Sequence, residues 1–116
     1  MRRYRIALVL MLLFLMANVR VYATHIRAGE IIAELLDCQS NTYRFTLIGY
    51  TDTGSTVLFG GGEMKFGDGS APIGFTPGNP DFFQDLGDEV ALNIFYAEHT
   101  FPGPGTYTIS YREFNR

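Results

Sequence analysis

Two segments rich in glycine and proline constrain the fold of this chain more than any other feature. Residues 66–70 read Phe-Gly-Asp-Gly-Ser, and residues 99–111 read His-Thr-Phe-Pro-Gly-Pro-Gly-Thr-Tyr-Thr-Ile-Ser-Tyr. The first ends an apolar run at an Asp-Gly turn, and the second leads through a Pro-Gly loop into alternating apolar and polar residues. Such turns between runs of period two are typical of antiparallel strands. We therefore predict an all-β protein with these segments at its strand ends.

The hydrophobic pattern has a period of two along most of the chain after residue 24, which is the strand signal. Residues 70–88 hold three prolines and three glycines, and they are predicted to form an extended loop with at most one short strand. The count and spacing predict an antiparallel β-sandwich of six or seven strands. The expected strands cover residues 25–36 (with a bulge at Gly29), 42–51, 56–59, 63–66, 73–75, 89–98 and 106–112.

The first 23 residues are predicted to be a secretory signal peptide. A basic start of Met-Arg-Arg-Tyr-Arg precedes the apolar residues 6–19, and Ala23 supplies a small residue for cleavage before Thr24. A membrane anchor is the alternative, but this run is shorter than the roughly 20 residues that a bilayer core requires, and Arg20 ends it. We expect one exported domain, residues 24–116, which is extracellular or associated with the outer-membrane surface and does not span a membrane after cleavage.

Charge argues against nucleic acid as a partner. Four of the nine basic residues lie in the predicted signal peptide, whereas all 12 acidic residues follow it, so residues 24–116 carry a formal charge of −7. A phosphate backbone would be repelled by this charge, and no stripe of Lys or Arg interleaved with aromatics offsets it.

The two opening segments resemble the PKD (polycystic kidney disease) domain, an immunoglobulin-like sandwich of secreted and cell-surface proteins. In that family a strand ends in aromatic-Gly-Asp-Gly, and a later His-x-aromatic segment precedes Pro/Gly and Thr-Tyr-x-Val. The usual Trp-Asp before the first segment is Met64-Lys65 here. The resemblance implies an immunoglobulin-like or PKD-like fold and a module that binds or spaces. The matching positions are Phe66, Gly67, Asp68, Gly69, His99, Phe101, Gly105 and Tyr107.

Three longer phrases are similar to the PKD-like amino-terminal region of surface proteins from gliding Bacteroidota. They are residues 24–31, 41–47 and 98–110, and the resemblance covers essentially all of the chain after residue 23. Such proteins often carry a carboxy-terminal sorting domain, so we expect either a piece of a longer surface protein or a free-standing domain. Many relatives have a second cysteine where this chain has Thr53, which puts a family disulfide of Cys38 in doubt.

The residues that could carry chemistry have structural interpretations. Asp68 is expected to accept backbone N–H groups in its turn, and His99 to hydrogen-bond across the sandwich to that turn. Catalysis by His99 would need a nucleophile or a second base, and the sequence offers no hydrolase motif, so we expect no enzyme. His25 is expected to be exposed. The single Cys38 is a buried small apolar residue, a free thiol or an intermolecular partner, and burial is the expected state.

Candidate binding residues lie mainly in the predicted loop. Phe82 and Phe83 either pin this loop onto the sandwich, the favoured interpretation, or present a recognition surface together with Tyr96. No cofactor is expected. Calcium is the weaker hypothesis, with ligands from Asp81, Asp85, Asp88 and Glu89 and a merely solvated acidic loop as the alternative.

These observations predict a non-catalytic, exported interaction or spacer module of a bacterial cell-surface protein linked to adhesion or gliding motility. Its partner is expected to be a protein or a carbohydrate at the cell surface. The alternative is an accessory carbohydrate- or protein-binding domain of a secreted hydrolase.

Overall fold

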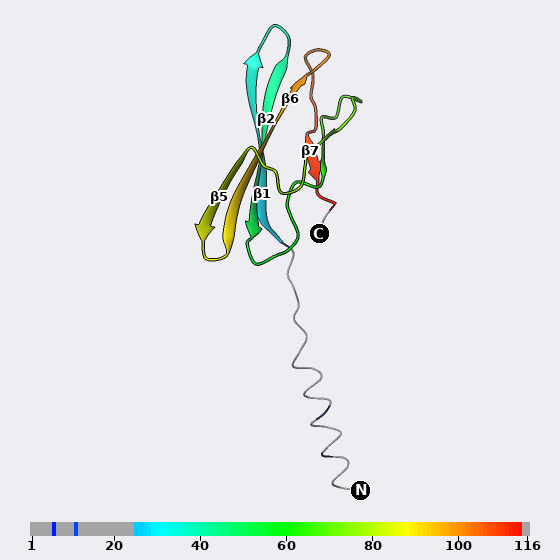
Figure 1. Ribbon diagram of the computed structural model, residues 1–116. Coiled ribbons are helices and arrows are strands. Elements are labelled where there is room, and N and C mark those ends of the chain that lie inside the picture. The colour runs from blue at the N-terminus through cyan, green and yellow to red at the C-terminus, as the bar shows by residue number, and fades with distance from the viewer. Residues whose placement is uncertain (1–5, 7–10, 12–24, 115–116) are drawn as a thin grey trace.

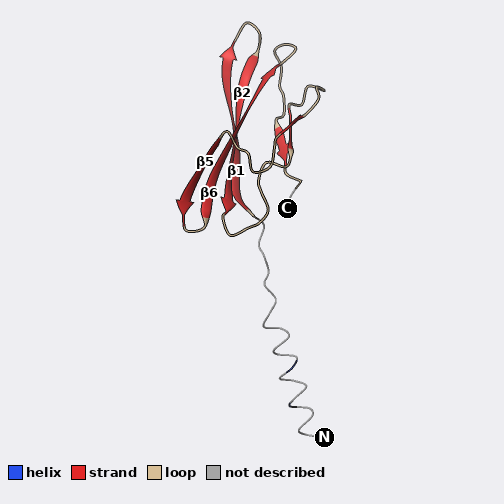
Figure 2. Ribbon diagram, in the orientation of Figure 1, coloured by secondary structure: helices blue, strands red, loops and turns tan. Residues whose placement is uncertain are grey.

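The computed structural model describes residues 6, 11 and 25–114, and the strands within residues 25–114 form two antiparallel sheets (Figures 1 and 2). The predicted signal peptide lies almost entirely outside these residues. The all-β prediction with two facing sheets is confirmed. The four-stranded sheet has the order β1-β2-β6-β5, with β1 at Ile26–Asp37, β2 at Thr42–Asp52, β6 at Val90–Thr100 and β5 at Phe82–Gly87. The three-stranded sheet has the order β4-β3-β7, with β4 at Ile73–Gly74, β3 at Glu63–Lys65 and β7 at Ser110–Arg112.

The central pair of the larger sheet follows directly from the alternating sequence. β2 pairs with β6 in unbroken register from Thr42 opposite Thr100 to Asp52 opposite Val90. Phe45 and Leu47 point inward and are 1% and 3% exposed, whereas the residues between and beside them are only half-buried. Period two thus places one face of the ladder in the core, as predicted.

The core lies between the two sheets and is mainly aromatic. Its fully buried members come from both layers, and the Phe45 and Phe66 rings lie 5.3 Å apart across the sandwich. Burying one such side chain stabilises the fold by roughly 1.5–3 kcal/mol. The core residues are Phe45, Leu47, Phe59, Met64, Phe66, Phe95, Ala97 and Phe101.

The predicted strand at residues 56–59 is wrong, because this segment forms bends. Phe59 is nevertheless buried, and its ring lies where a side chain on Gly49 of β2 would be, since a Cβ there would approach the ring to 2.3 Å. Gly60 follows with a φ of 102° and lies against Phe95. The Phe59 side chain therefore packs against the larger sheet, and Gly49 and Gly60 provide the space for this contact.

The expected loop at residues 70–88 contains two strands. The short strand near residues 73–75 is present as β4, but β5 was not predicted. β5 pairs with β6 through a two-residue turn of Asp88 and Glu89, both with positive φ, between Gly87 and Val90. This is the backbone of a tight hairpin, but its sequence lacks the glycine that usually marks one, so the signal was hidden.

Two further boundaries differ from the prediction. The β1–β2 register shifts twice, once between Ile26 and Ala28, just before the expected bulge at Gly29, and once between Leu35 and Asp37. The predicted last strand, residues 106–112, is a regular strand only at β7, although residues 106–109 run on beside the Gly67 turn. No helix in the part of the chain described here is long and apolar enough to cross a membrane.

Candidate functional site

The turn after β3 and the end of β6 are joined by a histidine-carboxylate hydrogen bond. Asp68 lies in the turn, and one of its carboxylate oxygens accepts hydrogen bonds from the Ser70 backbone N–H at 3.0 Å and from the Ser70 hydroxyl. His99, on the inner face of β6, reaches the other oxygen with Nε2 at 2.7 Å. The His99 and Asp68 side chains are 14% and 4% exposed. The expected contact of His99 with the turn is therefore present, and it connects the two sheets.

The hydrogen bonds around Asp68 stabilise its charged form. The Ser70 hydroxyl makes the largest contribution, and His99 makes the next, so the pKa of the Asp68 carboxyl lies well below its usual value of 3.8. A carboxylate held in this way is an acceptor at any ordinary pH, and it is not a proton donor.

Two aromatic rings contact the imidazole ring of His99. Its ring stacks on Phe66 with centroids 4.0 Å apart and planes 3° from parallel, and it meets Phe101 edge-on at 4.7 Å. Phe101 in turn stacks on Tyr107 at 4.3 Å, and the Tyr107 hydroxyl donates to the Gly103 carbonyl at 2.7 Å. The structure therefore brings the side chains of the PKD-like positions into one cluster.

Two of the matching glycines have positive φ. Gly67 has a φ of 73°, and a Cβ there would lie 2.6 Å from the Thr108 carbonyl oxygen, so no larger residue fits. Gly69, with a φ of 82°, faces open space and is required only for its backbone conformation. Gly105 differs, because a Cβ there would meet only the Tyr107 ring.

Serine, aspartate and histidine meet at this site, but in the wrong order for acyl transfer. In a catalytic triad the histidine lies between the nucleophile and the carboxylate, so that it can take the hydroxyl proton. Here Asp68 lies in the middle, and the Ser70 hydroxyl donates to the carboxylate instead of to His99. The arrangement stabilises the turn, and His99 is not in a position to accept the proton of the Ser70 hydroxyl.

A second carboxylate, which the sequence did not reveal, lies at the other end of β7. Glu113 is 6% exposed, and its Oε2 accepts hydrogen bonds from the Gly60 N–H at 2.9 Å and from the Tyr111 hydroxyl at 2.6 Å. Burial and the neighbouring Glu113 raise the pKa of the Tyr111 hydroxyl above its usual value of 10.0. This contact attaches the segment that carries Phe59 to β7. Only the interruption of the period-two pattern by a glutamate could have drawn attention to it.

The candidate binding aromatics divide between the two faces of the larger sheet. Phe82 lies opposite Ile94, and Tyr96 lies two residues further along β6, so both project from the outer face, where they are 45% and 49% exposed. Phe83 pairs with Asn93 and so belongs to the opposite face, where it lines a hollow of about 380 Å³ beside Leu58. Phe83 is 58% exposed and Phe82 is nearly as open, so the favoured interpretation that they pin a loop is wrong.

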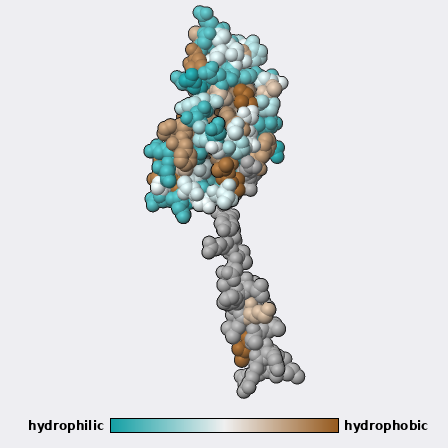
Figure 3. Space-filling model, in the orientation of Figure 1, coloured by the Kyte–Doolittle hydropathy of each residue, from teal (hydrophilic) through white to brown (hydrophobic). Residues whose placement is uncertain are grey.

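The outer face of the larger sheet carries large apolar side chains in two adjacent cross-strand rows, interrupted by Thr46 in one row and ended by Glu30 in the other. The register puts Ile32, Thr46 and Tyr96 in one cross-strand row, and Ile48, Ile94 and Phe82 in the next. Figure 3 shows apolar side chains gathered over β5 in the orientation of Figure 1. We call Ile32, Ile48, Phe82, Ile94 and Tyr96 the outer stripe.

The four calcium candidates do not converge. Asp81 accepts the Tyr96 N–H at 2.7 Å, and Asp85 accepts the Gly87 N–H at 2.9 Å, so each carboxylate stabilises its own turn or strand. Asp88 and Glu89 form the exposed hairpin turn. Within residues 25–114, no three His, Cys, Asp or Glu side chains are grouped so that they could hold a metal ion.

Two expectations about single residues are wrong. His25 is 2% exposed instead of exposed, because its carbonyl accepts the Asp52 N–H at 2.8 Å and draws the start of β1 against the end of β2. Cys38 is exposed instead of buried, since it lies in the turn that the Asp37 carboxylate caps by accepting the Gln39 N–H.

Comparisons of this chain with protein-family models, with curated proteins and with solved structures gave no match.

Proposed function

We propose that this chain is a non-catalytic, exported interaction or spacer module of a bacterial cell-surface protein, of the kind associated with adhesion or gliding motility. The observation that carries the proposal is the set of contacts that the His99 side chain makes. His99, which shares a cluster with a serine and an acid, stacks on Phe66, meets Phe101 edge-on and is hydrogen-bonded to Asp68, so it is not placed to activate the Ser70 hydroxyl. The proposed type of sandwich is immunoglobulin-like and PKD-like, and it is supported by the clustering of the matching side chains.

The outer stripe is the proposed contact face. Large apolar side chains on a sheet face that is half open to solvent are typical of surfaces that bind a partner. Ile32, Phe82 and Tyr96 are each between 45% and 49% exposed. The proposed ligand is a protein or a carbohydrate at the cell surface, and no cofactor is part of the proposal.

Binding to defined surfaces tests this role. The full-length chain, produced with its amino-terminal segment, is incubated with immobilised insoluble polysaccharides and with washed cells, and the retained fraction is measured. Tyr96→Ala and Phe82→Ala are expected to reduce retention. Leu58→Ala, which removes a side chain of similar exposure (56%) away from the stripe, is the matched control and should not. Equal loss in the control would contradict the stripe as the contact face.

The non-catalytic part has its own test. On a broad panel of hydrolase substrates, the chain is expected to show no turnover. Turnover that His99→Ala abolishes while the circular-dichroism spectrum stays unchanged would overturn the proposal.

The alternative is an accessory carbohydrate- or protein-binding domain of a secreted hydrolase. It is favoured by the two aromatic side chains, Phe82 and Tyr96, on one sheet face, which present apolar ring surface beside polar neighbours. Retention on polysaccharide without retention on cells would favour this alternative.

A further inference from the structure

The larger sheet is not fully covered by the smaller one. On β1, the residues that share the inner face with the core are Ile31, Ala33 and Leu35, which pair with Leu47, Phe45 and Tyr43 of β2. Their β2 partners Leu47 and Phe45 are 3% and 1% exposed, but Leu35 is 49% exposed and Ala33 is also exposed. Ala33 and Leu35 therefore lie open beside a filled core, whereas Ile31 in the same row is half-buried against that core.

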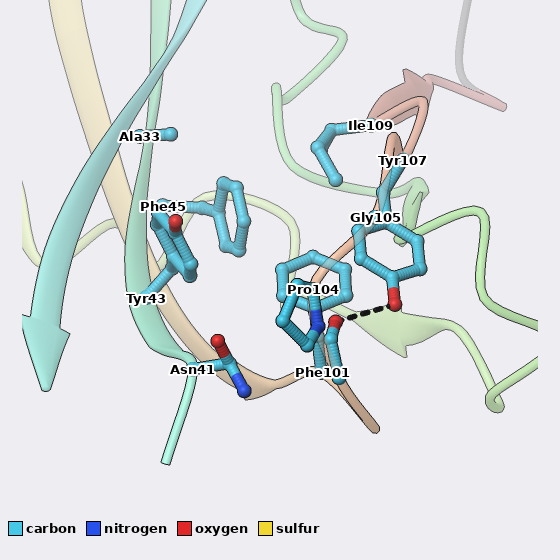
Figure 4. A pocket seen from close by; sticks show the side chains of 10 residues that line it. Ala33, Asn41, Tyr43, Phe45, Phe101, Pro104, Gly105, Tyr107 and Ile109 are labelled. Carbon is cyan, nitrogen blue, oxygen red and sulfur yellow. Dashed lines mark hydrogen bonds between the residues drawn. The ribbon is translucent and has the colours of Figure 1, made fainter. Parts of the chain in front are cut away.

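A groove runs between this row and the last segment of the chain. One hollow of about 370 Å³ is bounded by Ala33 and Phe45 on one side and by Tyr107 and Ile109 on the other (Figure 4). The next hollow, of about 530 Å³, is bounded by Ile31, Leu47 and Tyr111. Ile31 and Ala33 are two positions apart on β1, and Ile109 and Tyr111 are two positions apart on the last segment, so each pair lies on one face. The two hollows therefore follow one another along the strands.

The wall formed by the last segment is an unpaired strand edge. β7 is the end strand of its sheet, and among residues 25–114 no strand pairs with the side that faces away from β3. Side chains along the segment alternate, with Tyr107, Ile109 and Tyr111 half-buried toward the groove and the residues between them exposed. Such an edge presents a row of backbone donors and acceptors ready for another strand.

We propose that this groove receives a β-strand from a partner polypeptide, which adds to β7 and packs its alternate apolar side chains on Ile31, Ala33 and Leu35. A sugar or a lipid could cover the apolar floor, but only an extended peptide also supplies backbone groups at the spacing of the β7 edge. A strand that spans the groove from Tyr107 to Arg112 needs about six residues, at roughly 3.3 Å each.

Charge selects the kind of partner strand. Residues 24–116 carry 12 acidic and 5 basic side chains, so the chain as a whole has an acidic balance. A neutral or basic strand is therefore attracted, whereas a second copy of this chain meets its own charge. This inference goes beyond the proposed function, because it concerns a different surface from the outer stripe, and either can fail without the other.

Synthetic peptides test the proposal. The probe is a fluorescent peptide of alternating valine and threonine flanked by lysines, and the control peptide has the same composition with the valines grouped together. The full-length chain is expected to bind the alternating peptide, and to protect the amides of residues 108–112 from hydrogen exchange when it does. Equal binding of both peptides, or no binding of either, would overturn the proposal.

A matched pair of variants on β1 locates the site. Ala33→Glu places a carboxylate in the groove, and Leu36→Glu places one at an exposed position of the same strand that lines neither hollow. Ala33→Glu is expected to weaken peptide binding ~10-fold or more, because the charge would lose water without gaining a partner. Leu36→Glu should leave binding unchanged, and equal weakening by both variants would contradict the groove. Self-association in sedimentation that Ala33→Glu abolishes would identify a second copy as the occupant and reject the partner strand.

Discussion

The two ends of the smaller sheet are held by different carboxylates. Asp68 is fixed within its own turn by Ser70 and joined to the opposite sheet by His99. Glu113 has no turn of its own, and it holds Gly60 and Tyr111 together from beyond the end of β7. The turn around Asp68 is closed by a residue two positions away, whereas Glu113 accepts a hydrogen bond from Gly60, which is 53 residues away. Asp68 could therefore be recognised from the sequence, but Glu113 could not.

The largest effect should come from the core side chain next to the Asp68 end. Phe66→Ala removes a ring that is 1% exposed and stacked on His99, and should lower the free energy of unfolding by about 3–5 kcal/mol. Phe114→Ala at the Glu113 end removes a ring that is 54% exposed, and should cost less than about 0.5 kcal/mol. Urea unfolding followed by far-ultraviolet circular dichroism measures both. Similar losses would mean that the ends are equally packed.

Glu113→Ala should have the next largest effect. It leaves the Gly60 N–H and the Tyr111 hydroxyl without their acceptor, and one unsatisfied buried group costs roughly 1–3 kcal/mol. Glu113→Gln keeps an acceptor oxygen in place and should recover part of the loss in the same urea experiment. If alanine and glutamine are equivalent, the hydrogen bonds of Glu113 do not hold this end.

The two ends should respond to opposite extremes of pH. Because the folded-state pKa of Asp68 is depressed, its contribution to stability is complete above pH 3.8 and is lost as the pH falls below that value. The folded-state pKa of Tyr111 is raised, so its contribution is complete below pH 10.0 and is lost as the pH rises above it.

Urea midpoints across the pH range check this difference. Asp68→Asn should flatten the acid limb and leave the alkaline limb unchanged, whereas Tyr111→Phe should do the reverse. If the urea midpoint of Asp68→Asn still falls at low pH as in the unchanged chain, the acid-dependent loss of stability comes from other carboxylates.

The smallest effect should come from an ion pair outside both ends. Arg44 and Glu98 are joined at 3.0 Å on the outer face, with both side chains about half exposed. Arg44→Ala should change the free energy of unfolding by less than about 1 kcal/mol, since exposed pairs contribute little. A loss of stability as large as that of Glu113→Ala would mean that this exposed ion pair stabilises the fold as much as the buried Glu113 carboxylate does, which contradicts the expected order.

The parts of the fold that could be predicted are those set by neighbours in sequence. Alternation located β2 and β6, β-branched residues and Gly29 favoured a strand at β1 over a short helix, and the Gly-Asp-Gly turn with His99 located the connection between the sheets. β5 was missed because Asp88 and Glu89 adopt positive φ without glycine, which only pairing with β6 enforces. The residues before Gly60 favour a strand, and this is why a strand is predicted there. In the structure the segment instead bends so that the Phe59 ring packs over Gly49 of β2.

The candidate surfaces were predicted only in part, for a related reason. Phe82 and Tyr96 share a face because two strands are in register, and Phe83 is excluded from that face by the same register. Aromatic residue type alone cannot give this division. The exposure of Ala33 and Leu35 was also hidden, because their alternation looks the same whether or not a sheet covers them.

The place of Ile26 beside Tyr111 and Glu113, around one hollow, has a mechanical consequence. The beginning of β1 and the end of β7 lie at the same end of the domain (Figure 1), so a force that acts on both elements loads the fold at one end instead of along its length.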